Sequence, residues 1–203
     1  HLIAQYPATQ RTDSKLLVAI ESIQHEIFKD IGNHINEGDL LILNKTSVIP
    51  ARLFGEKITG GKIEILLERF LSDHQTLTQI RSARAPKDGA ELVFTFQDKR
   101  FLATVKGRKD NFFILDWPAD PRPLFELYGQ IPLPPYMNRA VEKLDEDRYE
   151  TIYADPDKKE SVAAPTAGMH FDEELFNKLQ HKGVEFGYVN LHVGAGTFQP
   201  VQT

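Results

Sequence analysis

Six short segments between residues 50 and 117 constrain the fold of this chain more than any other feature. They cover residues 52–58, 62–70, 76–82, 91–96, 100–105 and 112–117, and they are rich in apolar, β-branched and aromatic residues. Turn-forming sequences such as Gly60-Gly61 and Gln97-Asp98 separate them. Strands this short, joined by tight turns, favour a small antiparallel barrel or sandwich.

The segment 62–70 shows the strand pattern clearly. Its apolar residues Ile63, Ile65 and Leu67 occupy every second position, and they alternate with Glu64, Leu66 and Glu68. Successive side chains of a strand point to opposite faces, so this period of two predicts a half-buried strand. Both glutamates are expected on the face that is less buried.

The residues before this region follow another pattern. Residues 16–20 and 40–43 are typical of short buried strands. Apolar residues at helical spacing between positions 27 and 35 predict a helix from about Gln24 to Gly38. Strand, helix and strand in this order indicate part of a parallel or mixed sheet.

Helical and strand patterns return after Pro121. We expect a short helix over 124–128, an extended proline-rich run over 131–136 and a helix over 145–154. Asp172 is a favourable N-cap for a further helix that ends at Gly183, and residues 184–193 predict a strand.

Together these patterns predict an α+β chain with two domains. A discontinuous α/β domain with a mixed sheet is expected over residues 1–49 and 134–203. The small antiparallel β-barrel is expected over residues 50–133, as a domain inserted into the first one.

Composition argues against several classes of protein. Hydrophobic residues make up 41% and charged residues 26%, and no apolar run approaches the ~20 residues of a membrane-spanning helix. Without cysteine there is no disulfide, thiolate metal site or thiol nucleophile, and we expect a cytoplasmic protein. The net charge of -5 argues against a wholly basic surface for nucleic acid, although it leaves room for a local basic patch.

Two loops combine small residues, a hydroxyl and a histidine. The first, residues 162–171, includes Thr166, Gly168 and His170, and the second, residues 191–200, includes His192 and a glycine-rich turn. Small residues let a ligand approach the backbone closely, and loops on a rigid scaffold often carry binding sites. We therefore expect both loops to contact a ligand.

The two histidines are candidate general bases, because histidine titrates near neutral pH. His170 precedes a helix N-terminus, which would lower its pKa and favour the neutral imidazole. The structural alternatives are a His170 that bonds the loop backbone and a His192 that is a satisfied core group. A metal site with Asp172 is a third interpretation, but no ligand spacing supports it and we expect no metal.

Other polar residues are candidate ligand contacts. Asn44 and Thr46 follow a buried strand, with turn capping as the alternative. Thr166 is either a ligand contact or a turn hydroxyl, and Arg52 either binds an anionic group or pairs on the surface. The second loop, with Gly194, Gly196 and Thr197, lacks the third glycine and the lysine of nucleotide-binding fingerprints. Its alternative interpretation is a tight turn.

Basic residues of the predicted barrel form a candidate basic face. They are Lys62, Arg69, Arg81, Arg84, Lys87, Lys106, Arg108 and Lys109. Phosphate contacts would make the affinity depend on salt. Strand edges protected by lysine are the alternative. Tyr136, after its proline run, either stacks on a nucleic-acid base or packs against the neighbouring domain.

Taken in order, these motifs resemble the S-adenosylmethionine:tRNA ribosyltransferase-isomerase family of queuosine biosynthesis. The matching stretches are Leu2 to Gln5 with Arg11 and Ser14, residues 38–41 with Asn44 and Thr46, residues 48–53, 61–64 and 132–136, and the two loops. The chain departs from the family at Ser47, where arginine is usual, and at Glu160, where glycine is usual. The family also continues beyond residue 203 with a His- and Met-rich stretch and a Gly-Thr-Thr loop.

The resemblance implies an enzyme that transfers and isomerises the ribosyl moiety of S-adenosylmethionine. The acceptor is 7-aminomethyl-7-deazaguanine in the tRNA wobble position, the product is epoxyqueuosine, and adenine and methionine are released. S-adenosylmethionine is then the co-substrate and tRNA the partner, and we expect no metal, no membrane and a monomer. The implied catalytic residues are His170 and His192. The implied substrate-binding residues are Asn44, Thr46, Arg52, Pro165, Thr166, Ala167, Gly168, Gly194, Gly196 and Thr197.

Two other functions fit the same features. One is a non-catalytic RNA-binding module in which the small-residue loops are structural. The other is a hydrolase that acts on a nucleoside-like small molecule without RNA. The loop chemistry and the order of the motifs favour the transferase-isomerase.

Overall fold

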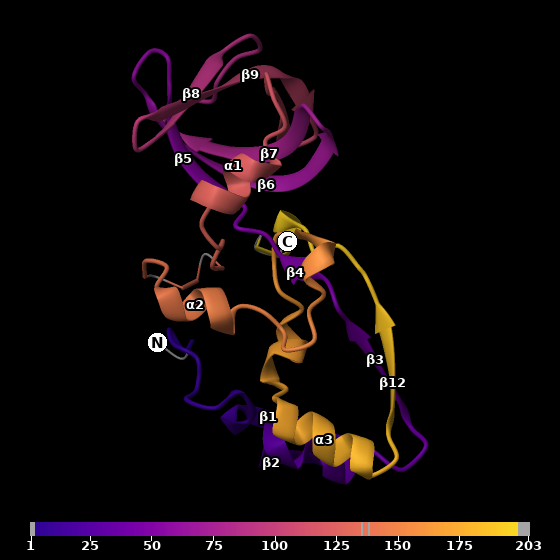
Figure 1. The fold of residues 1–203 in the computed structure, drawn as a ribbon. Coiled ribbons are helices and arrows are strands. Elements are labelled where there is room, and N and C mark those ends of the chain that lie inside the picture. The colour runs from indigo at the N-terminus through magenta and orange to yellow at the C-terminus, as the bar shows by residue number, and fades with distance from the viewer. Residues whose placement is uncertain (1–2, 135, 138, 199–203) are drawn as a thin grey trace. The chain divides into compact units, whose positions relative to one another are not determined.

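The computed structural model describes residues 3–134, 136–137 and 139–198 (Figure 1). Among the residues named in the motifs above, Leu2, Pro135, Gln199 and Pro200 lie outside the described ones. The chain divides into two compact units. The α/β unit comprises His1–Ser47, Pro135–Lys159 and Ala164–His192, and the barrel unit comprises Val48–Pro134, Glu160–Ala163 and Val193–Thr203.

The barrel unit contains a closed barrel of six antiparallel strands in the order β10-β7-β6-β5-β8-β9 (Figure 1). The strands are β5 (Arg52–Lys57), β6 (Lys62–Ser72), β7 (Gln75–Ser82), β8 (Glu91–Phe96), β9 (Lys99–Lys109) and β10 (Phe112–Asp116). Each predicted segment forms one of these strands, so the predicted antiparallel barrel is confirmed. Closure pairs every strand on both sides and leaves no open sheet edge.

Apolar side chains fill the interior of the barrel. Those that are fully buried are Leu53, Ile65, Leu67, Leu92, Phe94, Val105 and Leu115. Helix α1 (Arg122–Tyr128) adds Phe125, whose ring packs edge-on against Phe70 and Trp117 at centroid distances of 5.8 and 6.2 Å. The barrel therefore has a core of its own, which α1 extends.

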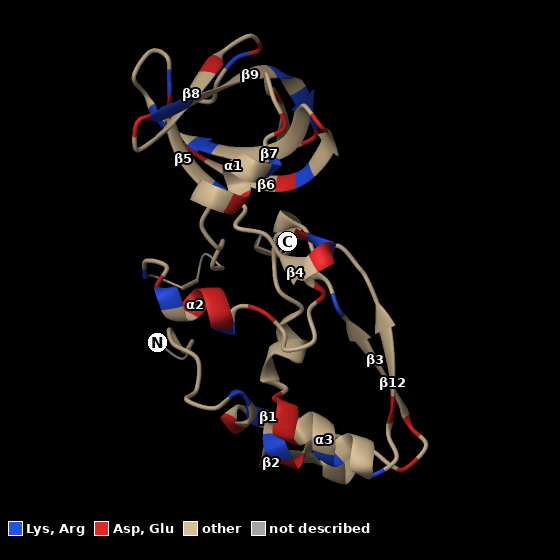
Figure 2. Cartoon of the chain, viewed as in Figure 1, with Lys and Arg blue, Asp and Glu red and all other residues tan. Residues whose placement is uncertain are grey.

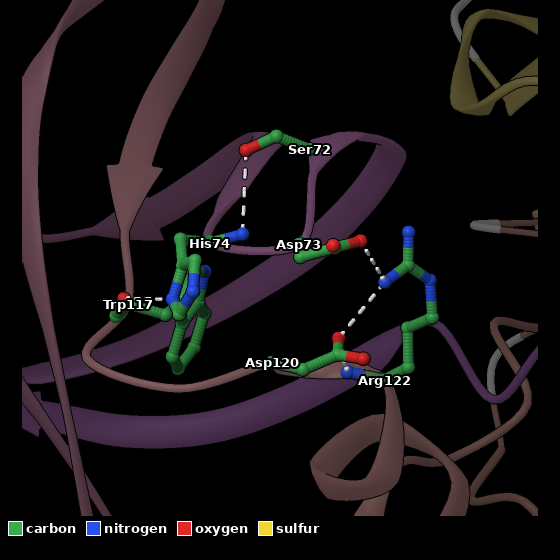
Figure 3. A network of polar contacts seen from close by, with 6 residues as sticks. All are labelled: Ser72, Asp73, His74, Trp117, Asp120 and Arg122. Carbon is green, nitrogen blue, oxygen red and sulfur yellow. Dashed lines mark hydrogen bonds and ion pairs between the residues drawn. The ribbon is translucent and has the colours of Figure 1, made fainter.

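A polar network links the β6–β7 turn to the segment that leads into α1 (Figure 3). Arg122 Nη1 lies 3.0 Å from Asp73 Oδ1 and 3.1 Å from Asp120 Oδ1. The His74 ring places Nδ1 3.2 Å from the carbonyl oxygen of Trp117. Exposed ion pairs contribute little to stability, so this network mainly specifies the geometry of one end of the barrel.

Strand β6 departs from simple alternation at Glu68. Leu67 pairs with Thr78 and Arg69 with Leu77, so Glu68 is the extra residue of a β-bulge. The expectation that Glu68 lies on the less buried face is wrong, since it is only 7% exposed. The physical reason is the bulge, which inserts one residue and lets two neighbouring side chains be buried together.

The α/β unit contains two small sheets (Figure 1). β1 (Lys15–Ala19) and β2 (Ile23–Ile27) form an antiparallel hairpin, and β3 (Leu40–Asn44) runs parallel to β12 (Glu185–Val189). The mixed sheet that we expected is wrong for the described residues, because the parallel pair and the hairpin are separate sheets.

The helix predicted from Gln24 is also wrong in its first part. Residues Ile23–Ile27 pair with β1, and only Phe28–His34 are helical, as the 3-10 helix η2. The β-branched residues Ile23 and Ile27 suit a strand, and hairpin pairing takes precedence over the helical spacing of the apolar residues.

Helix α3 (Glu173–His181) forms where its N-cap predicts it. Asp172 Oδ1 accepts a hydrogen bond of 2.8 Å from the N–H of Leu175. Gly183, at φ +86°, then reverses the chain toward β12. Leu175 and Leu179 pack into the core of this unit, which also contains Phe28, Phe171 and Val184.

The predicted helix over 145–154 is shorter and starts earlier, as α2 (Lys143–Arg148). Glu142 and Asp145 form a capping box at its start. The remaining short elements are η1 (Arg11–Asp13), β4 (Ser47–Val48), η3 (Pro156–Lys158), β11 (Lys159–Ser161), η4 (Thr166–His170) and η5 (Ala195–Phe198). None of the helices that the structure describes has both the length and the apolar character that crossing a membrane requires.

Candidate functional site

The first loop forms the 3-10 helix η4, with Thr166 and Ala167 exposed and Gly168 buried. A Cβ added to Gly168 would lie 2.0 Å from Tyr153 Oη and 2.9 Å from Thr151 Cγ2. Burial raises the pKa of Tyr153 to about 12, with a smaller contribution from Tyr188, so this phenol stays protonated at neutral pH. Glycine is therefore needed at position 168 because the backbone packs directly on Tyr153.

His170 ends η4 and is half-buried. Its ring centroid lies 5.2 Å from that of Phe28, which in turn packs edge-on against Phe171. Burial, followed by the positive charge of Arg11, lowers the pKa of His170 below its ordinary value. The imidazole is thus neutral at physiological pH, which is the form that can accept a proton.

Arg11 fixes the backbone beside this histidine. Its guanidinium donates to the carbonyl oxygens of Met169 at 3.0 Å and Asp147 at 2.8 Å, and it also reaches that of Arg148 at 3.5 Å. Carbonyl oxygens from two segments therefore converge on one cation. In the sequence, Arg11 is a family motif residue that either binds an anionic group or pairs on the surface, and the structure adds its part in holding the first loop.

Asn44 fixes the start of the second loop. It ends β3, and its side-chain amide makes two hydrogen bonds of 2.9 Å with the backbone of Leu191, one as donor and one as acceptor. Its Oδ1 also accepts from the N–H of Thr46 at 3.2 Å. His192, which follows Leu191, is exposed, whereas Thr46 is fully buried. Asn44 thus places His192 at the surface of the α/β unit.

The rest of the second loop belongs to the barrel unit. Val193 donates its N–H to Ser161 Oγ at 2.9 Å, and its carbonyl accepts from the N–H of Val162 at 2.8 Å. The N–H of Ala195 donates to Glu68 Oε2 at 2.7 Å. Thr197 Oγ1 donates to the carbonyl of Gly194 at 3.0 Å, so its hydroxyl closes the turn. The tight turn is therefore present, and the buried carboxylate of Glu68 in β6 is hydrogen-bonded to its backbone.

Arg52 also lies in the barrel unit. Its Nε is 3.1 Å from Glu64 Oε1, and its Nη2 donates to the carbonyl of Leu133 at 3.3 Å. This geometry gives the guanidinium partners within the protein. A pocket of about 470 Å³ in the barrel unit is lined by Phe54, Gly55, Glu56, Lys62, Ile63, Val93 and Thr95, and none of these is a predicted substrate-binding residue.

The predicted site residues therefore fall in both units. Asn44, Thr46, Pro165, Thr166, Ala167, Gly168, His170 and His192 belong to the α/β unit, and Arg52, Gly194, Gly196 and Thr197 to the barrel unit. Sequence reasoning missed Arg11 and Glu68 as residues that hold these loops. The family motif was a signal for Arg11, whereas the alternating pattern placed Glu68 on the wrong face. No group of three or more potential metal ligands occurs among the described residues.

Comparison with known proteins places this chain in a family. Residues 1–203 match the family model described as queuosine biosynthesis protein. The chain belongs to this queuosine biosynthesis family. Proteins from two strains of Acinetobacter baumannii, each named S-adenosylmethionine:tRNA ribosyltransferase-isomerase, are 48% identical to it over 204 aligned residues. The alignment covers 100% of this chain and 59% of each relative, so the chain spans about three-fifths of their length.

A solved structure from the same comparisons is that of an S-adenosylmethionine tRNA ribosyltransferase from Thermotoga maritima. The two sequences are 34% identical. The match covers 95% of the present chain and 55% of the Thermotoga maritima chain, with a TM-score of 0.36.

Proposed function

We propose that the protein containing this chain is an S-adenosylmethionine:tRNA ribosyltransferase-isomerase. It transfers the ribosyl moiety of S-adenosylmethionine onto 7-aminomethyl-7-deazaguanine in the tRNA wobble position and isomerises it to give epoxyqueuosine. Adenine and methionine are released. The observation that carries this proposal is the 48% identity, over the whole of this chain, to relatives that bear this name.

His170 is the proposed general base, which removes a proton from the carbon beside the sulfonium. Its lowered pKa supports this role, because the neutral imidazole is available to accept the proton at physiological pH. The Arg11 contact to the Met169 carbonyl supports it as well, since it restrains the residue next to the base. His192, exposed beside the residue that Asn44 anchors, is the second proposed catalytic residue.

The proposed substrate contacts divide by exposure. Thr166, Ala167 and Gly196 are exposed and offer surface to S-adenosylmethionine. Gly168, Gly194 and Thr46 are not exposed, so we propose that they act by shaping the loops. Pro165, Asn44, Arg52 and Thr197 complete the proposed set. No metal ion takes part in this proposed reaction.

The proposed macromolecular partner is tRNA, and a tRNA-modifying monomer would act in the cytoplasm. Lys and Arg are interspersed with Asp and Glu on the barrel strands (Figure 2). Lys62, Lys87 and Lys109 are exposed members of the candidate basic face. Contacts from such residues to phosphates would weaken steeply as salt is raised.

The test uses the full-length protein with S-adenosylmethionine and tRNA that carries 7-aminomethyl-7-deazaguanine. The expected result is formation of epoxyqueuosine in the tRNA, together with one adenine for each modified nucleoside, both measured by liquid chromatography and mass spectrometry. tRNA with guanine at the wobble position is the control. Adenine release without a modified nucleoside would refute the proposed product, and tRNA binding without S-adenosylmethionine affinity would indicate an RNA-binding module.

The proposed base is tested with His170→Ala and a matched control, His181→Ala. His181 is an exposed histidine at the end of α3, bonded to the carbonyl of Asn177. Loss of a general base costs about 10²–10⁴-fold in rate. We expect that loss in kcat for His170→Ala, with little change for the control. An unchanged kcat in His170→Ala would remove this residue as the base.

A further inference from the structure

The barrel places a buried carboxylate against the glycine loop, which we define as residues 193–198. Glu68 is the extra residue of the bulge in β6 and is 7% exposed. A bulge re-aims the side chain that it carries. Its two oxygens have different neighbours, since Oε2 accepts from the N–H of Ala195 at 2.7 Å and Oε1 lies 3.4 Å from Arg69 Nη2.

The same carboxylate explains why residue 194 is glycine. A Cβ at position 194 would lie 2.3 Å from Glu68 Oε1 and 2.9 Å from Glu68 Cδ. The carboxylate is the end of a flexible side chain and could move away, but that movement would break its bond to the N–H of Ala195. Gly194 and the Glu68–Ala195 hydrogen bond are therefore two parts of one contact.

Gly196 has a different environment. It is exposed, and a Cβ at this position would meet no atom within 4 Å. The protein itself therefore does not require glycine there. The two glycines that look equivalent in the sequence thus differ, since Gly194 faces Glu68 and Gly196 faces solvent.

We propose that Glu68 is a positioning residue that holds the glycine loop in its binding conformation and leaves Gly196 as the glycine that S-adenosylmethionine approaches. Glu68 does not touch the co-substrate. It acts through the N–H of Ala195, which belongs to a buried residue at the start of η5. The part that concerns S-adenosylmethionine rests on the proposed function, whereas the loop-holding part does not.

The loop-holding part is tested by hydrogen exchange, measured by mass spectrometry on the full-length protein. Glu68→Ala should speed exchange at the amides of residues 194–198 by about tenfold or more, because a hydrogen bond to a charged acceptor is lost. Glu68→Gln should restore most of the protection, since its amide oxygen can still accept. Glu91→Ala, which removes an exposed barrel carboxylate, is the matched control. Unchanged exchange in Glu68→Ala overturns the proposal, whether or not the protein is an enzyme.

The co-substrate part is tested by steady-state kinetics. Glu68→Ala should raise KM for S-adenosylmethionine about tenfold or more, with kcat within about threefold, because a disordered binding loop weakens ground state and transition state alike. Glu68→Gln should return KM to within about threefold of the parent. A fall in kcat at constant KM, or a Gln variant no better than Ala, contradicts positioning.

A double-mutant cycle separates the two glycines. Gly194→Ala should raise KM in the parent but add little in the Glu68→Ala background, because the clash is then gone. Gly196→Ala should leave hydrogen exchange in the loop unchanged and still raise KM. If Gly194→Ala raised KM by the same factor in the parent and in Glu68→Ala, the pairing of Gly194 with Glu68 would be contradicted. If the parent protein shows no turnover, the proposed function fails while the exchange experiment still decides the role of Glu68. If Glu68→Ala does not fold, Gly194→Ala replaces it as the variant that breaks the Glu68–Ala195 contact, and Glu68→Gln remains the variant that keeps this contact.

Discussion

The contact between Gly168 and Tyr153 leads to a prediction that can be worked out from the structure. In Gly168→Ala, the new methyl group would meet Tyr153 Oη at 2.0 Å, Thr151 Cγ2 at 2.9 Å and Tyr153 Cζ at 3.1 Å. Tyr153 has little room to retreat, since its ring packs against Phe176 and Tyr188 at centroid distances of 5.5 and 6.2 Å. Overpacking of this kind costs about 1–3 kcal/mol.

The pair Gly168→Ala and Tyr153→Phe tests this reasoning. Removing the hydroxyl relieves the shortest contact, at 2.0 Å, whereas the contact of 2.9 Å between the new methyl group and Thr151 Cγ2 remains. The free energy of unfolding, measured by urea denaturation, should therefore fall by about 1–3 kcal/mol in Gly168→Ala and recover in part in the double variant. Gly32→Ala is a control, because its new methyl group would have 3.4 Å to Leu179 Cδ2. Equal stabilities of Gly168→Ala and the parent would refute the argument.

Three further predictions concern residues that hold the α/β unit together. Arg11→Met should raise the pKa of His170 part of the way toward its ordinary value, because the nearby positive charge is lost while burial, the larger cause, remains, and NMR titration of the ring would show it; a pKa equal to that of the parent contradicts the role of Arg11. Asn44→Ala should cost about 0.5–1.5 kcal/mol of unfolding free energy in urea, because the hydrogen bonds that hold the Leu191 backbone are lost, and an unchanged midpoint would be the contrary result. Arg139→Met should cost about 3–5 kcal/mol, because Asp145, paired with it at 2.6 Å, is left buried and charged. Arg139 lowers the pKa of Asp145, so the pair stabilises the protein above the ordinary carboxyl pKa, and this stabilisation is lost as the pH falls through the lowered value. The parent should therefore lose more stability in acid than the Arg139→Met variant, and equal losses would contradict the pairing.

Patterns that depend on neighbours in the sequence were enough to predict several elements. The six barrel strands follow from alternation over a few residues and from the turns between them. The N-cap at Asp172 and the reversal at Gly183 are likewise local, and α3 lies between them. Local chemistry also indicated that His170 would favour the neutral form, although the structure assigns this to burial and Arg11.

Pairing between strands decided the elements that were predicted wrongly. Apolar residues between positions 27 and 35 have helical spacing, yet Ile23–Ile27 form a strand because β1 offers a hairpin partner. The prediction of a mixed sheet was wrong for a related reason. Strand β3 pairs in parallel with β12, which lies far along the chain, whereas β1 pairs with β2. The spacing of apolar residues within a segment carries no information about which strand that segment will pair with.

The sequence by itself determined the barrel, the order of the motifs and the family to which the chain belongs. Only the tertiary structure showed that Glu68 is buried at a bulge and accepts a hydrogen bond from Ala195, and that Gly168 is glycine because of Tyr153. The physical reason is that alternation assigns a side chain to a face only while the strand stays regular. A close packing contact, by comparison, exists only after distant segments have been brought together.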